Sequence, residues 1–167
     1  MKYTLLLLAI ACWGICCKDK TTTNVSISNL PFPNVAYTKA VAYVYAPSDG
    51  ASIVSRTGQL HHTAQNECEL LPEQTKTLLN LLNDSKTYGD NVMRCFTPTI
   101  GIVFYDAQEK TVAHISFSFA CNNHNASSAI GAASQNPANL LGFSREGKSK
   151  LLEFEKSLSW KPMAQND

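Results

Sequence analysis

The sequence has few charged residues, and their signs nearly balance. Asp, Glu, Lys and Arg make up 16% of the 167 residues, with 14 basic against 13 acidic side chains and a formal net charge of +1. The basic residues form no cluster along the chain. A nucleic-acid-binding surface needs concentrated positive charge to neutralise phosphates. The composition therefore argues against nucleic acid as a partner.

The motifs that identify common enzymes are also missing. The sequence contains no Gly-x-Ser-x-Gly nucleophile motif, no Cys-x-x-Cys pair and no Gly-rich loop of the kind that holds phosphates. Cys68 could be drawn as a nucleophile with His61 or His62 as its base, but the adjacent Glu67 and Glu69 disfavour a thiolate. We predict no catalytic residues and no cofactor.

No apolar stretch near the N-terminus is long enough to span a membrane as a helix. The run over residues 3–17 covers 15 residues, whereas a spanning helix needs roughly 20. A single basic residue, Lys2, precedes this short apolar run, which is typical of a secretory signal. We expect residues 1–16 to be a signal peptide and the protein to be exported.

Three cysteines end this run and give the segment the form of a bacterial lipoprotein precursor, which is cut before a cysteine that then carries the lipid. Cys17 leaves a suitable apolar length before it and is followed by the charged, threonine-rich residues 18–23. We predict lipidation at Cys17, with Cys16 and Cys12 as alternatives, and residues 17–30 as a tether. An ordinary cleaved signal whose cysteines have no role is the competing interpretation. A lipid anchor would place the protein on the bacterial cell envelope, at a periplasmic or outer surface, with the membrane as its partner.

The remaining chain, about 150 residues, is long enough for one domain with a real core. Residues 36–46 alternate as a strand does and stop at the turn signals of residues 47–50. A helix begins at Pro72, and a second follows Ser144, which can cap it; Trp160 completes the apolar stripe of the second helix. We expect a further short strand pair around Thr57 and Gly58, and a loop over the Asn- and Ser-rich residues 122–139.

The most informative pattern lies between Cys95 and Cys121. Residues 100–105 and 111–120 are rich in β-branched and aromatic side chains, and the polar residues 106–110 separate them. This arrangement predicts a β-hairpin. The alternation in its second strand predicts that five side chains face the core: Ala113, Ile115, Phe117, Phe119 and Cys121.

Counting outward from the turn of this hairpin predicts a disulfide. A pairing of Tyr105 with Thr111 places Val103 opposite Ala113, Gly101 opposite Ile115 and Cys95 opposite Cys121. Pro98 interrupts the first strand, but the strand ends should still lie close together. In an oxidising compartment two neighbouring cysteines form a disulfide. We predict the Cys95–Cys121 bond and, for residues 31–161, a single α+β domain: an antiparallel sheet with a central hairpin, packed by two helices.

A metal site is the alternative use of the same side chains. The chain offers seven soft or borderline donors: His61, His62, Cys68, Cys95, His114, Cys121 and His124. Their spacing does not require a site, and the strand alternation places His114 on the opposite face from Cys121. We therefore predict no bound metal.

Parts of the chain resemble a family of small uncharacterised bacterial envelope lipoproteins. The resemblance begins at Gln59-Leu60, continues through residues 71–74, and is closest in the hairpin, in residues 95–106, which read Cys-Phe-Thr-Pro-Thr-Ile-Gly-Ile-Val-Phe-Tyr-Asp, and in residues 113–123. It covers about two thirds of the mature chain. Family members often carry a second cysteine where this chain has Ser118. The resemblance implies the fold and the compartment, and no activity.

Three functions are compatible with these features. The first is a non-catalytic envelope lipoprotein that binds a ligand or partner through its sheet face or its Asn- and Ser-rich segment. The second is an inhibitor of a hydrolase at the cell surface, a role that suits a rigid, disulfide-bonded domain. The third is a metal-binding or thiol protein. We expect the first, without assigning the ligand or partner.

Overall fold

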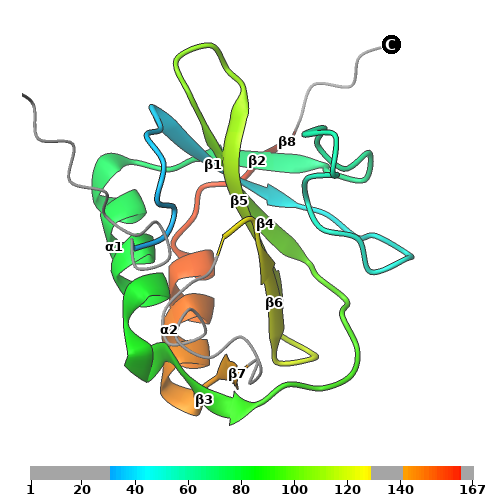
Figure 1. Cartoon of the computed structure of the whole chain (residues 1–167), viewed down its shortest axis with the longest axis vertical. Coiled ribbons are helices and arrows are strands. Elements are labelled where there is room, and N and C mark those ends of the chain that lie inside the picture. Colours follow the sequence, from blue (N-terminus) through cyan, green and yellow to red (C-terminus); the bar gives the residue numbers. More distant parts are fainter. Residues whose placement is uncertain (1–30, 129–140, 163–167) are drawn as a thin grey trace, which may run out of the picture.

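A sheet and a pair of helices form two layers (Figure 1). The computed structural model describes residues 31–128 and 141–162, and within them the main sheet has six strands in the order β6-β5-β4-β1-β2-β8, all antiparallel. This confirms the predicted α+β fold. The strands of this sheet are β1 Lys39–Val44, β2 Asn66–Glu69, β4 Ile100–Tyr105, β5 Thr111–Ser118, β6 Asn123–Ala126 and β8 Lys161–Pro162. A smaller sheet pairs β3 Tyr88–Asn91 with β7 Leu141–Phe143.

The two helices begin where the sequence predicts. Helix α1 spans Pro72–Asn83, and the Gln74 side chain accepts a hydrogen bond from the Leu71 amide at 2.9 Å at its start. Helix α2 spans Arg145–Lys156, and the Ser144 hydroxyl caps it by accepting from the Gly147 amide at 3.1 Å. A single 3-10 turn, Ser85–Thr87, connects α1 to β3. Both helices lie on the same face of the main sheet (Figure 1).

The β4–β5 hairpin forms as predicted, but its register differs from the predicted one. Tyr105 pairs with Thr111, and a bulge at Val112 then shifts every later pair by one residue. Val103 therefore lies opposite His114 and Gly101 opposite Ser116, so the predicted pairs beyond the turn are wrong. The shift puts the large side chains Ile100, Ile102 and Phe104 on the same face as Ala113, Ile115 and Phe117, where the helices cover them.

Apolar side chains are buried on both faces of the sheet. The larger cluster lies under the helices and joins β1, β2, β4 and β5 to Leu78, Leu82 and Leu151. The smaller cluster lies on the other face, where Val41, Tyr43, Tyr45 and Val103 pack against Ile53 and Val54. These last two come from the long β1–β2 connection, drawn in cyan in Figure 1, away from the helices. We call this second surface the connection face.

The Asn-rich segment after Cys121 departs from the prediction. Residues 123–126 form strand β6, which pairs with β5 from Ser118↔Asn123 to Ile115↔Ala126, so the expectation of a loop is wrong there. Residues 129–140 lie outside the described residues. The expected short pair around Thr57 and Gly58 is present as a bridge between Val54 and Leu60.

Candidate functional site

Three hollows in the described surface differ in what lines them. One, of about 450 Å³, lies between α1 and α2, with Leu81 and Phe154 among long charged side chains. Another, of about 590 Å³, lies beside the N-terminal segment 31–36. The third, of about 520 Å³, lies on the connection face and is the most enclosed. Its walls hold two histidines and several hydroxyl and amide groups, the kinds of polar group that orient a ligand in a binding site.

This third hollow, the connection pocket, forms between the β1–β2 connection and the strands β5 and β6. Its lining residues are Ala51, Ser52, Val54, Ser55, Arg56, His61, His114, Asn125, Ala126 and Ser127.

Ile53 anchors the connection to the sheet. Its side chain is fully buried over Gly101, where an added Cβ would lie 2.6 Å from Ile53 Cγ1 and 2.7 Å from Cγ2. Its amide donates a 2.9 Å hydrogen bond to the buried Ser116 hydroxyl. Only glycine at position 101 therefore lets the chain approach the sheet this closely. The residues on either side of Ile53 form one wall of the pocket.

Hydrogen bonds within the connection fix the shape of this wall. The Ile53 carbonyl accepts from the His61 amide at 2.8 Å, and the Gln59 carbonyl accepts from the Ser55 amide at 2.8 Å. The Tyr45 ring centroid lies 5.8 Å from that of His61, and the Tyr45 hydroxyl donates to the Ala51 carbonyl at 3.2 Å. Burial raises the pKa of Tyr45 to about 12, so it remains a neutral donor at physiological pH. Hydrogen bonds thus fix this wall both at Ala51 and at His61.

The opposite wall comes from β5, β6 and the residues that follow. The Ser52 hydroxyl donates to Asn125 Oδ1 at 2.7 Å and so joins the two walls. The Ser127 hydroxyl accepts from the His114 amide at 3.0 Å, and the Ser127 amide donates to the His114 carbonyl at 2.9 Å. These contacts place the polar ends of Asn125 and Ser127 at the pocket.

The two histidines of the pocket differ in their surroundings. His61 Nδ1 accepts from the Thr63 amide at 3.3 Å and lies 2.8 Å from the Thr63 hydroxyl, which itself accepts from the Ala46 amide. These contacts place the proton of the neutral His61 ring on Nε2. His114 is half-buried on β5, and its burial lowers the pKa of the ring, which keeps it neutral near pH 7. Its ring nitrogens bond to no other residue of 31–128 or 141–162.

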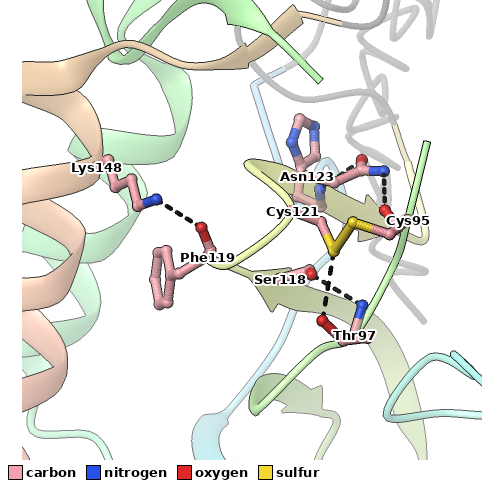
Figure 2. Close-up of a disulfide and its surroundings, with 8 residues drawn as sticks. Cys95, Thr97, Ser118, Phe119, Cys121, Asn123 and Lys148 are labelled. Carbon is pink, nitrogen blue, oxygen red and sulfur yellow. Dashed lines mark hydrogen bonds between the residues drawn. A yellow bond between two sulfur atoms is a disulfide. The ribbon is translucent and has the colours of Figure 1, made fainter. Parts of the chain in front are cut away.

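The predicted disulfide is present at the far end of the hairpin. Cys95 and Cys121 are bonded, with their Cα atoms 5.6 Å apart (Figure 2). The Thr97 amide donates to the Ser118 hydroxyl at 2.9 Å, and the Asn123 side chain donates to the Cys95 carbonyl at 3.2 Å. Ser118 is fully buried, and its hydroxyl thus fixes the segment that precedes β4 against β5.

Of the other donors considered for a metal site, Cys68 and His124 lie away from the histidines of the connection pocket. Cys68 is a buried free thiol in the core under the helices, whereas His61 lies on the connection face, so the two do not form a nucleophile and base pair. His124 is buried against Tyr88 and Phe143. Among the residues that the structure describes, no three His, Cys, Asp or Glu side chains are grouped as metal ligands would be.

The predicted lipidation residues Cys12, Cys16 and Cys17 lie outside the described residues, as do the signal peptide and the tether. Within the described part of the chain, no helix has the length and apolar character needed to cross a membrane.

Sequence reasoning found part of the connection pocket. It singled out His61 and His114, though as possible metal ligands, and it named the sheet face and the Asn- and Ser-rich segment as binding surfaces. It missed Ser52 and Arg56, because the sequence does not show which of its many polar side chains meet after folding. It could not place Gly101 under Ile53 for the same reason. Comparison of the chain with protein-family models, with curated proteins and with solved structures finds no match.

Proposed function

We propose that this chain is a non-catalytic lipoprotein of the bacterial envelope that binds a small polar ligand in the connection pocket. The observation that carries the binding role is the pocket itself, a hollow of about 520 Å³ with convergent polar groups held by hydrogen bonds. Known small-molecule sites range from about 300 to 1,000 Å³ and combine a few placed polar groups with a largely formed shape.

The envelope location is supported by the sequence and by the disulfide. The apolar run that ends in Cys16 and Cys17 is typical of a lipoprotein signal. The bond between Cys95 and Cys121 suits an oxidising compartment, since cytosolic thiols are kept reduced.

Fragment screening by NMR tests the binding role. Small polar fragments should shift the amide resonances of Ser52, Arg56, His114 and Asn125 in the ¹⁵N-labelled full chain. The hollow between α1 and α2 and the one beside residues 31–36 provide internal comparisons. Fragments that gather in either of those hollows and leave the connection pocket unperturbed would contradict the proposal.

A second candidate function, inhibition of a cell-surface hydrolase, is favoured by the segment preceding β4. The Met93 amide bonds to the Cys121 carbonyl at 3.0 Å, Cys95 is held by the disulfide, and the Thr97 amide bonds to Ser118. The side chains of Met93 and Arg94 remain exposed on this rigid support. An exposed segment fixed at alternate residues loses little entropy when a protease cleft binds it.

This second candidate predicts inhibition of a protease that selects basic residues. The purified chain should slow trypsin, and Arg94→Gln should abolish the effect while Arg145→Gln preserves it. Rapid cleavage after Arg94 without any inhibition would exclude the role.

A further inference from the structure

We infer that the ligand of the connection pocket is a small oxyanion, a molecule that presents a carboxylate or phosphate group; this inference rests on the proposed binding function. Charge is the first reason. The residues that line the pocket include Arg56 and no Asp or Glu. Arg56 is exposed and forms no ion pair with any acidic side chain of residues 31–128 or 141–162. An unpaired guanidinium suits carboxylate and phosphate groups, which accept its paired N–H donors.

The hydrogen bonds of the pocket walls give the second reason. Asn125 uses its Oδ1 to accept from Ser52, which leaves the Nδ2 donor available. Ser127 uses its hydroxyl oxygen to accept from the His114 amide, which leaves the hydroxyl proton available. In both side chains, the acceptor atom is bonded to the protein and a donor group remains available to a ligand.

His61 also bonds to the protein through an acceptor and offers a donor to the pocket. Its Nδ1 accepts from Thr63, so the neutral ring carries its proton on Nε2 and is a donor. Arg56, His61, Asn125 and Ser127 together give the pocket an excess of donors over acceptors. A neutral polyol, which brings one donor with every hydroxyl acceptor, would leave some of its own protons unpaired. An oxyanion brings acceptors only, and it matches this set.

Two probes of nearly equal shape, one charged and one neutral, show whether binding depends on the negative charge of the ligand or on its shape. Acetate and acetamide differ only in that an NH2 group replaces one carboxylate oxygen, which removes the negative charge. In NMR titrations of the ¹⁵N-labelled full chain at pH 7, acetate and inorganic phosphate should shift the amides of residues 52–56 and 125–127. Acetamide should bind at least tenfold more weakly, because hydrogen bonds to a charged acceptor are stronger than those to a neutral one. The stronger of acetate and phosphate then identifies the oxyanion.

Two arginine variants complete the test. Arg56→Gln should weaken acetate or phosphate binding tenfold or more, while Arg145→Gln, at the start of α2 in the other layer, should leave it unchanged. Equal binding of acetate and acetamide, or equal loss in both variants, would overturn the oxyanion assignment and leave the binding pocket standing. If the NMR fragment screen also finds no ligand in this pocket, the proposed function fails with it.

Discussion

Gly101 is a single residue on which the candidate site depends. Because Gly101 has no side chain, Ile53 can lie against β4, and this contact positions the neighbouring residues that line the connection pocket. Gly101→Ala should lower the free energy of unfolding by about 1 to 3 kcal/mol, because an added methyl overpacks a closed contact. Urea unfolding measures the loss, and displaced amide resonances of residues 51–56 would accompany it.

A double-mutant cycle separates this steric contact from a general effect of alanine in β4. Ile53→Ala alone should cost about 2 to 5 kcal/mol by leaving a cavity. Combined with Gly101→Ala, it should cost less than the two single changes together, because the new methyl no longer meets the isoleucine. Strict additivity would show that the two residues do not touch.

His124 makes stability depend on pH. Its ring is buried against Tyr88 and Phe143, its Nδ1 has no partner within the described residues, and burial lowers its pKa to about 4. The unfolded state, with a histidine pKa of about 6.5, therefore binds more protons between these two values. Folding stability is complete above pH 6.5 and should fall by about 3 kcal/mol as the pH drops towards 4.

Urea unfolding of the wild type and His124→Phe between pH 4 and 8 isolates this contribution. The variant lacks the titrating group but keeps the carboxylates, so its stability should fall less towards acid. The exposed His62, changed to Gln, provides a matched control that should follow the wild type. Parallel pH curves for the wild type and His124→Phe would contradict the assignment.

At the scale of elements, the alternation of β5 was readable from sequence and its register was not. Side chains of opposite character alternate from Ala113 to Ser118, and the structure keeps that division of faces. The bulge at Val112 has no local signature in the sequence; its effect, which brings Ile102 and Phe104 under the helices, depends on the packing of distant elements. Strand β6 was missed because Asn and Ala, three of its four residues, are depleted in strands, and its pairing with β5 is not visible in the sequence.

The disulfide was predictable because it depends on the hairpin and tolerates a shift of one residue. Removing it should destabilise the fold, since the bond closes a loop of 26 residues in sequence separation. The chain-entropy model gives up to about 3 to 4 kcal/mol for Cys95→Ser combined with Cys121→Ser, and less where the hairpin persists in the unfolded chain. Denaturant unfolding of the oxidised wild type and the double variant measures the difference. Cys68→Ala, which removes a buried thiol that is not part of the disulfide, supplies a cysteine control without loss of a cross-link.

At the scale of the whole molecule, the chain enters the fold on the side opposite to the connection pocket. Residues 31–36 lie beside α1, where Asn83 holds Phe32 through hydrogen bonds of 2.8 and 2.9 Å. Phe32 packs on Phe104 in the core under the helices. The first described residues therefore lie on the helix side of the main sheet, away from the connection pocket.

Lipidation predicts where the whole protein resides. Cys17→Ser should release the chain from the membrane fraction and remove the mass of the attached acyl chains, while Cys16→Ser and Cys12→Ser should leave both unchanged. Fractionation and mass spectrometry of the three variants report the outcome. Continued membrane attachment of Cys17→Ser would move the assignment to Cys16 or Cys12.

The most direct test of a ligand-binding envelope protein is native mass spectrometry of the chain recovered from bacterial envelopes without denaturant. We predict that the wild type carries a small bound molecule and that Ala51→Trp, which fills the pocket without removing a side-chain hydrogen bond, has lost it. Ala107→Trp, in the exposed hairpin turn, should retain the molecule. A bare chain in every sample, or a molecule kept by folded Ala51→Trp, would contradict the account.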